Sequence, residues 1–506
     1  MSDIFNSSII QFHSKEDGFN LYDQSTSGSS ELSYNKFGVL SLEMIASEMT
    51  VEKQYIHSSN DMSGSMSDIC NDGRTKMQHL KLTLENIVTL LSKNANKIDV
   101  DLEITGFDTK IEEVLNFTRI TEDSKQLMEI HNKIKSVLLA RGCTDIGIAL
   151  NDAASKLKTQ NISEKSFIFM TDGIITQGTT NIEILKEALP EKSQNDFIGF
   201  GSDHDFKLLQ ELSTVNMGTY YYVDKIENAG LVFGEIIHSI LYTISKNNII
   251  TVNNGEIYDF QRNEWVTELK IQNLCAESKK DFHVRSKTPE TFSINISGVT
   301  KDSEYNYNEQ TLPSLINEDN TIEPVDLRKY MYRQKTLELL ATSITIAKNK
   351  YSTYQEKISH QEALKDLRNE LQTFAKEFVN DADTTAYIKQ LCDDLYISDA
   401  TLHSDKSLLY TTARRTTQGR GGSYNITQLE KCDIQRQNAF TGFNDDEDYH
   451  VNEYPVSRFA SDTQVEVMRS CSLAGYNDEE TESEQTQVQE NVFNLQRSNA
   501  IYTEEY

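Results

Sequence analysis

The stretch SNDMSGSMSD, residues 59–68, places one carboxylate and two hydroxyls at alternate positions, at Asp61, Ser63 and Ser65. Gly64 lies between the serines and leaves the backbone free to turn. Three chemistries could use such a stretch: a hydrolase could use a serine as its nucleophile, a phosphate site could use the amides of the loop, and a hard cation could use all three oxygen-bearing side chains. A polar turn that caps the next helix would have the same composition. The rest of the chain must decide among them.

Helix-like and strand-like segments alternate around this stretch. Apolar residues recur at three- and four-residue spacing, as on one face of a helix, along residues 77–91, 127–138 and 145–157. Runs typical of strands occupy residues 97–107, 165–173, 195–201 and 218–224. Such alternation requires crossover connections, which favour a mainly parallel sheet covered on both faces. Residues 51–245 are therefore expected to form an α/β domain with a doubly wound, Rossmann-like sheet.

The segments on either side of this domain differ from it in composition. Residues 1–35 are polar and rich in Ser, Asn and Asp, which predicts a flexible segment, and residues 36–50 have the pattern of strands. Residues 246–323 contain short alternating runs separated by turn-forming residues. This pattern predicts a small antiparallel sandwich that flanks the α/β domain, and the strands of 36–50 can join it.

The C-terminal part of the chain changes character twice. Residues 324–411 return to a helical pattern, which predicts a bundle of two or three helices. From residue 412 to 506 the periodicity disappears, and residues 445–506 contain fifteen acidic and three basic residues. An acidic segment with few large aliphatic residues cannot bury enough apolar surface to fold, so 412–506 is expected to be a largely disordered tail. The basic, glycine-rich run 411–422 is interpreted as a solvated linker rather than an RNA contact.

Composition excludes several classes of function. A chain of 506 residues is expected to hold two or three domains, and its formal charge of -29 opposes binding to nucleic acid or to anionic membranes. Six scattered cysteines without a CxxC pair favour neither a disulfide framework nor a zinc site. The sequence has no signal-peptide pattern and no run of about 18 apolar residues, so no membrane span is expected. We therefore expect a cytoplasmic protein or, if the source is a virus, one associated with the virion.

Three loops carry oxygen ligands to one edge of the predicted sheet. Asp61, Ser63 and Ser65 follow its first strand, Thr144 precedes a helix, and Asp172 ends the most apolar strand. Ligands of open α/β sheets bind where such loops converge, at the carboxyl ends of the strands. Two carboxylates and three hydroxyls suit a hard cation, and Mg²⁺ fits best because Ca²⁺ usually takes more carboxylates. Mn²⁺ or Ca²⁺ remain alternatives.

In residue type, order and spacing, these loops resemble the metal-ion-dependent adhesion site of the von Willebrand factor type A domain. The motif Asp61-x-Ser63-x-Ser65, Thr144 and the pair Asp172-Gly173 carry the resemblance, with SGSM at 63–66 and GFGSDHD at 199–205 as further similar segments. It covers roughly residues 50–245. The β-rich part and the helical segment beyond it resemble intracellular members with inter-alpha-inhibitor-like architecture.

The resemblance implies a role for each site residue. Ser63, Ser65 and Thr144 would supply hydroxyl ligands, directly or through water, while Asp61 and Asp172 would act through water or hydrogen bonds. An ion with few direct carboxylate ligands stays electrophilic, so a glutamate or aspartate of a partner protein can fill its open position. The leading hypothesis is therefore a non-enzymatic, Mg²⁺-dependent protein-interaction module. The alternative is a structural or assembly protein that keeps the fold while its metal site is incidental or empty.

The strand that leads into the motif departs from the family pattern. Its sequence, KQYIHSSND at 53–61, has polar residues from His57 to Asn60 where buried aliphatic residues are expected. Each unpaired buried polar group would cost roughly 1–3 kcal/mol. The strand is therefore either short and irregular, or its side chains are hydrogen-bonded. Catalysis by Ser63 is not expected. The nearby base would be His57, but alternate strand residues point to opposite faces, and the chain has no GxSxG elbow.

Overall fold

The computed structural model describes residues 4–14, 36–45, 53–70, 73–215, 218–223, 229–301, 303–310, 325–378, 380–420 and 461–473. The chain divides into two compact units. The first, which we call the α/β unit, comprises residues 47–243 and 460–479. The second, the β-helical unit, comprises residues 1–46, 244–459 and 480–506. None of the described helices is both long enough and apolar enough to cross a bilayer.

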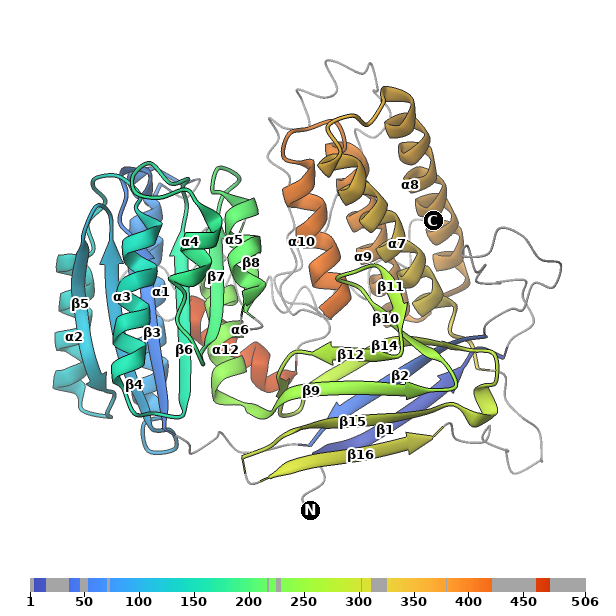
Figure 1. Cartoon of the computed structure of the whole chain (residues 1–506), viewed down its shortest axis with the longest axis horizontal. Helices are drawn as coiled ribbons and strands as arrows, with labels where there is room; N and C mark the ends of the chain where they lie inside the picture. The colour runs from blue at the N-terminus through green and yellow to red at the C-terminus, as the bar shows by residue number, and fades with distance from the viewer. Residues whose placement is uncertain are drawn as a thin grey trace. The chain divides into compact units, whose positions relative to one another are not determined.

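A six-stranded sheet with the order β5-β4-β3-β6-β7-β8 forms the centre of the α/β unit (Figure 1). Its strands are β3 Gln54–Asp61, β4 Val100–Phe107, β5 Ile111–Arg119, β6 Glu164–Thr171, β7 Gln194–Phe200 and β8 Thr219–Val223. All neighbours pair in parallel except β5, which runs antiparallel to β4 at one edge. The predicted fold class, a mainly parallel α/β sheet, is confirmed. The edge strand β5 was not predicted.

Helices cover both faces of this sheet (Figure 1). They are α1 Lys76–Lys93, α2 Ser124–Val137, α3 Ile146–Thr159, α4 Ile182–Glu187, α5 Phe206–Ser213, α6 Ala229–Leu241 and α12 Asp462–Leu473. On one face, aromatic side chains of the central strands, including Phe167, Phe169 and Phe197, pack against α3, α4 and α5 in one buried cluster. On the other face, α1 and α6 contact each other and both contact α12.

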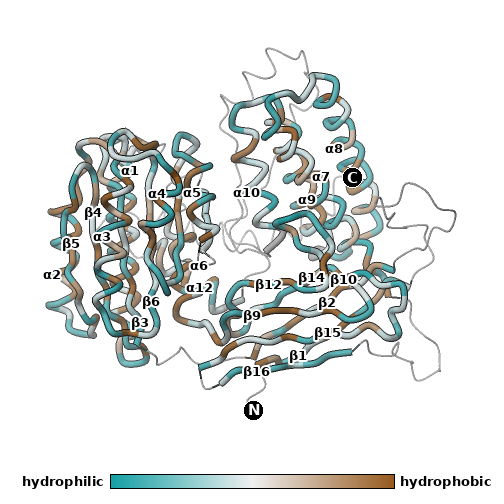
Figure 2. Tube along the Cα trace, viewed as in Figure 1, coloured by the Kyte–Doolittle hydropathy of each residue, from teal (hydrophilic) through white to brown (hydrophobic). Residues whose placement is uncertain are grey.

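Helix α12 lies within the stretch 412–506, which was expected to be largely disordered. The difference has a physical cause in α6, which is buried on all sides and is largely hydrophobic in Figure 2. A helix that is apolar all round needs a covering element. Helix α12 provides the cover with Val467, Met468 and Cys471, which are at most 4% exposed. Three such residues among polar neighbours give too weak a periodic signal to be found in the sequence.

Two sheets make up the β-rich part of the β-helical unit. One has the order β1-β2-β14-β10-β11 and the other β12-β9-β15-β16, with β13 also paired to β9. Their bounds are β1 Phe5–Phe12, β2 Lys36–Met44, β9 Thr243–Asn253, β10 Glu256–Asp259, β11 Glu264–Val266, β12 Glu268–Ile271, β13 Leu274–Cys275, β14 Lys279–Ser286, β15 Ser293–Val299 and β16 Glu304–Gln310. One buried cluster contains residues of both sheets, such as Leu40 and Ile296, so the two sheets share a core.

Strand β1 differs from the flexible segment predicted for residues 1–35. It pairs antiparallel with β2, which in turn pairs with β14. Phe5 and Ile10 are buried in the shared core and anchor this strand. The polar composition of 1–35 hid them, because the average over a long segment conceals a short amphipathic run.

The helices α7 Arg328–Lys348, α8 Tyr354–Ala375, α9 Ala382–Thr401 and α10 Ser407–Arg420 belong to the described part of the β-helical unit. Figure 2 shows that α8 is largely hydrophilic, and its buried leucines face a common cluster with α9. Helix α10 includes residues 411–420, which were interpreted as linker. Arg414 and Asp394 are each about 1% exposed and form an ion pair at 3.2 Å. Buried polar contacts of this kind hold α10, so hydrophobic periodicity could not reveal it.

Candidate metal centre

Strand β3, which leads into the candidate site, is regular despite its polar sequence. All eight residues are buried, and the strand pairs along its length with β4 and along most of it with β6. Ser59 Oγ lies 3.1 Å from Thr105 Oγ1, and Ser58 Oγ donates to Asn60 Oδ1 at 3.2 Å. Asn60 Nδ2 donates to the Thr105 carbonyl at 3.1 Å. Of the two alternatives left by the sequence, hydrogen-bonded side chains are therefore the one observed.

A buried charged group supports the start of the same strand. The Glu103 carboxylate of β4 accepts a hydrogen bond from Tyr55 and lies 2.9 Å from Lys156 Nζ and 3.6 Å from His57 Nδ1. Burial opposes the charge of Glu103, but the hydrogen bonds of His57, Tyr55 and Lys156 outweigh burial and lower its pKa to about 2. The carboxylate thus stays ionised and serves as a buried partner for Tyr55 and His57 of β3.

Asp61, the first residue of the motif, is engaged through both carboxylate oxygens. Its Oδ1 accepts the backbone N–H of Ser63 at 2.7 Å, and its Oδ2 accepts the Thr171 hydroxyl. Burial raises the Asp61 pKa to about 6, against the lowering effect of these hydrogen bonds and with a smaller contribution from Asp172. Asp61 therefore orients the loop between β3 and the short 3-10 helix η1, Gly64–Ser67.

The hydroxyls of the motif and the third loop meet at Asp172. Ser63 Oγ lies 3.0 Å from Ser65 Oγ, and Ser65 Oγ donates to Asp172 Oδ1 at 2.7 Å. The side chain of Asp172 is fully buried. Three of the predicted metal-binding residues, from two loops, thus form one continuous group of oxygen atoms at the carboxyl ends of β3 and β6.

Thr144, from the second loop, lies next to Gly173, as Ser65 does. A Cβ atom built on Gly173 would lie 3.5 Å from Thr144 Oγ1 and 3.7 Å from Ser65 Oγ. The glycine after Asp172 therefore leaves open a small volume that faces both hydroxyls. Backbone contacts fix the loops around it, since Gly64 N donates to the Gly142 carbonyl at 3.2 Å and Thr144 N donates to Thr176 Oγ1 at 2.8 Å.

Two acidic residues near these loops have other tasks. Asp145 caps α3 by accepting the Ile148 N–H at 3.3 Å. Asp108 forms an ion pair with Arg141 at 2.8 Å. Both carboxylates therefore stabilise the surrounding loops.

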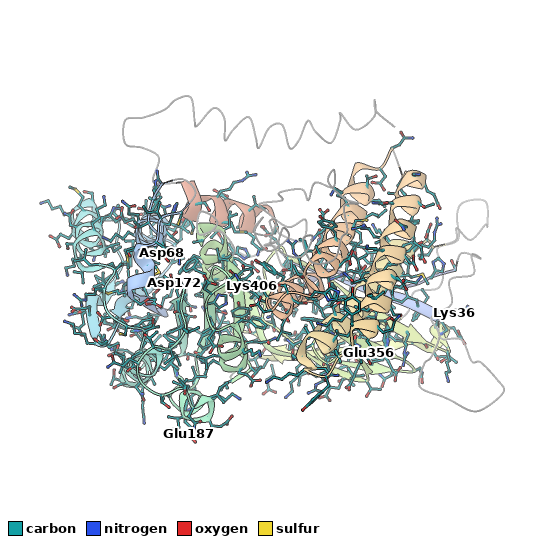
Figure 3. The ribbon with its side chains drawn as sticks, turned by 90° about the horizontal axis from the view of Figure 1, so that it is seen from above. Lys36, Asp68, Asp172, Glu187, Glu356 and Lys406 are labelled. Carbon is teal, nitrogen blue, oxygen red and sulfur yellow. The ribbon has the colours of Figure 1, made fainter. Side chains whose placement is uncertain are left out.

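Lys76 is the residue that sequence reasoning missed. It is the first residue of α1, and its Nζ lies 2.7 Å from Asp172 Oδ2 and 3.1 Å from Asp68 Oδ2. Figure 3 shows Asp172 and Asp68 close together in the α/β unit. A lysine at the N-terminus of a helix is placed against the helix dipole, so it calls for a nearby anion. That unfavourable position was the signal that could have revealed it.

The residues present fit a hard divalent cation. Within the described part of the chain, no three His, Cys, Asp or Glu side chains are grouped as a metal cage, so hydroxyls would have to supply the ligands. Serine and threonine hydroxyls beside a carboxylate form an oxygen donor set of the kind that Mg²⁺ accepts. In the structure Asp172 forms an ion pair with the Lys76 ammonium at 2.7 Å.

Comparison with known proteins identifies the class of this unit. Residues 60–222 match the von Willebrand factor type A domain family. This part of the chain is therefore a von Willebrand factor type A domain, as the resemblance implied. The wider inter-alpha-inhibitor-like architecture stays a prediction.

Several solved structures are similar to the chain. A von Willebrand factor type A protein from Catenulispora acidiphila is 14% identical, with 81% of this chain and 90% of that chain covered and a TM-score of 0.44. The ArnB paralog VWA2 from Sulfolobus acidocaldarius is 13% identical, with 83% and 99% covered and a TM-score of 0.43. The PilB minor pilin from Streptococcus sanguinis is 15% identical, with 46% and 77% covered and a TM-score of 0.31. No curated protein sequence matches the chain.

Proposed function

We propose that the type A domain is a non-enzymatic interaction module that binds an acidic residue of a partner protein through Mg²⁺. The observation that carries the proposal is the convergence of the Ser63, Ser65 and Thr144 hydroxyls beside Asp172. Bound at these oxygens, Mg²⁺ would supply a hard electrophile with an open position for a carboxylate. The preceding type A domain assignment is consistent with an interaction module of this kind.

Each site residue contributes separately to such a centre. Asp61 is committed to the Ser63 N–H and the Thr171 hydroxyl, so it positions the two serines. Asp172 accepts the Ser65 hydroxyl with Oδ1, and its negative charge would help to balance that of an ion. The direct ligands would be neutral hydroxyls, and the ion would keep most of its attraction for an external carboxylate.

The geometry gives no support to a hydrolase. A serine nucleophile needs a base within hydrogen-bond reach. His57 Nε2 instead lies 3.2 Å from Ser59 Oγ and 3.3 Å from Thr105 Oγ1, within the buried network of β3 and β4. The Ser63 hydroxyl lies 3.0 Å from Ser65 Oγ, and a serine hydroxyl does not act as a base at neutral pH.

A second candidate function is a structural or assembly protein in which this site holds no metal. The contact between Lys76 and Asp172 favours it, because a protein ammonium then neutralises the carboxylate that would otherwise face the ion. Such a protein would use its fold, rather than a metal, to contact partners.

Thermal unfolding of the full chain separates the two candidates. We expect the melting temperature to be about 5–10 °C higher, with a saturable dependence, in Mg²⁺ than in EDTA. At a Mg²⁺ concentration of about 100 times the dissociation constant of the site, binding adds roughly 2.7 kcal/mol to the free energy of unfolding. The double variant Ser63→Ala/Ser65→Ala should lose this rise. Ser67→Ala is the matched control, since its hydroxyl donates to the Gly64 carbonyl and should leave the rise unchanged. No rise in the wild type with millimolar Mg²⁺ would favour the assembly protein.

A further inference from the structure

The start of α1 fixes Lys76 beside the candidate metal centre. Thr75 and Gln78 form a capping box, in which each side chain satisfies the backbone N–H of the other residue. The Lys76 N–H also donates to the Asp68 carbonyl at 3.0 Å. The first turn of α1 is thereby held in place, and the lysine side chain extends from it toward Asp172.

Lys76 and Asp172 form an unequal pair. The carboxylate side chain is fully buried, whereas the lysine side chain is 22% exposed. A buried carboxylate needs a positively charged partner, because loss of that partner leaves an uncompensated buried charge and strongly destabilises the fold. Burial works against the ammonium, but Asp172 and Asp68 outweigh it and raise the Lys76 pKa above its ordinary value. The ammonium is therefore a permanent positive charge at the site at neutral pH.

This ammonium occupies a position that matters to an incoming ion. Asp172 has two oxygens, of which Oδ1 accepts from Ser65 and Oδ2 accepts from Lys76. A divalent cation held by the Ser63 and Ser65 hydroxyls would meet the repulsion of the ammonium and would share Asp172 with it. The same lysine has a second acceptor in Asp68, whose side chain is 63% exposed. Lys76 can thus keep an ion pair after it gives up Asp172.

We propose that Lys76 is a resident cation that sets the Mg²⁺ affinity of this site by competing for Asp172, with Asp68 as its alternative partner. The proposal rests on the metal-binding function proposed above and adds the residue that regulates it. Without metal, Lys76 neutralises Asp172 and keeps the buried carboxylate in place. With metal, the ammonium moves toward Asp68, and Asp172 becomes available to the ion.

Two substitutions should therefore change the affinity in opposite directions. Lys76→Met removes the competing charge while it keeps a long, unbranched side chain, so Mg²⁺ should bind at least tenfold more tightly. Asp68→Asn removes the charge that receives the displaced ammonium, so Mg²⁺ should bind several-fold more weakly. Lys81→Met is the matched control on the same helix, because Lys81 Nζ donates to the Lys135 carbonyl instead, and it should bind like the wild type.

The test is calorimetric titration of MgCl₂ into the full chain and its three variants, with melting temperatures measured in EDTA. Equal affinity in wild type and Lys76→Met, or weaker binding in Lys76→Met, would overturn the proposal. Because Asp68 is exposed, Asp68→Asn should fold even if Lys76→Met does not. An unchanged Mg²⁺ affinity in Asp68→Asn would also overturn the proposal. If neither the wild type nor any variant gives a heat of binding, the proposed metal-binding function itself is refuted. That result differs from an unchanged affinity, which would refute only the role of Lys76.

Discussion

At the scale of single residues, the two aspartates of the site have different surroundings and different tasks. Asp61 accepts hydrogen bonds from within the fold, while Asp172 faces a hydroxyl on one side and an ammonium on the other. The motif could be predicted to bring the oxygens together, since chain order and strand ends fix their positions. For Lys76 the sequence offered only the unfavourable position of a lysine at a helix N-terminus, and its contact with Asp172 depends on where α1 begins.

The buried polar strand shows the same limit of sequence reasoning. Its residues could be recognised as unusual, but their partners Glu103 and Thr105 lie on β4, more than forty positions along the chain. Only the parallel register of β3 with β4 places them side by side. The cost expected for unpaired polar groups is therefore avoided through contacts that a single strand cannot reveal.

His204 gives the type A domain a defined response to acid. The histidine is buried, its Nδ1 lies 2.6 Å from the Gly201 carbonyl and its Nε2 lies 2.6 Å from the Tyr220 hydroxyl. Since a carbonyl only accepts, Nδ1 carries the proton and Nε2 accepts from the tyrosine. Burial lowers the His204 pKa from 6.5 to about 4, and the hydrogen bonds that the ring makes to the Gly201 and Phe200 backbone oppose this shift.

A lowered folded-state pKa means that the stabilisation is complete above the unfolded value of 6.5 and is lost as the pH falls toward 4. We expect the free energy of unfolding to drop by up to roughly 3 kcal/mol more in the wild type than in His204→Gln over this window. Urea unfolding of both proteins at several pH values measures the difference. Parallel pH profiles would contradict this assignment.

At the scale of elements, helices α6 and α12 of the α/β unit approach each other closely. A Cβ atom on Gly234 would lie 2.4 Å from Met468 Cα, and one on Gly230 would lie 2.7 Å from the Cys471 carbonyl oxygen. Asn86 Nδ2 of α1 donates to that same carbonyl at 2.8 Å. Small residues on α6 thus let the two helix backbones meet, and α1 holds the end of α12.

Gly234→Ala should therefore destabilise the α/β unit, although the same change in an exposed helix would stabilise it by roughly 0.5–1 kcal/mol. The added methyl group would meet the backbone of α12, which cannot move as a flexible side chain can. In a chain that ends before residue 460, the substitution should lose its penalty, because α12 is gone. Melting temperatures of the four proteins in this cycle measure the coupling, and an equal effect of the substitution in both chain lengths would refute the contact.

The elements that sequence patterns predicted are those with long apolar stripes or runs, such as α1, β6 and β7. Those that were missed depend on partners elsewhere in the chain. Helix α10 is held by the ion pair of Arg414 with Asp394, β1 by Phe5 and Ile10, and α12 by the apolar surface of α6. A short element whose stabilisation is tertiary carries little periodicity of its own.

At the scale of the whole molecule, the α/β unit is assembled from two distant stretches, residues 47–243 and 460–479. The β-helical unit is built largely from the chain between them. This organisation could not be predicted from composition, since the acidic character of residues 445–506 pointed to a solvated tail. A test of the type A domain therefore requires the full chain, because a protein cut at residue 412 would lack α12.

Hydroxyls from two loops are proposed to hold a divalent ion beside Asp172. The most direct measurement is anomalous X-ray scattering from crystals of the full chain soaked in Mn²⁺, which marks the ion itself. We expect a peak about 2.1 Å from the Ser63 and Ser65 hydroxyl oxygens, on the side of Thr144 and Asp172, that is absent from Ser63→Ala/Ser65→Ala crystals. A peak at another place, or none at millimolar Mn²⁺, would contradict it.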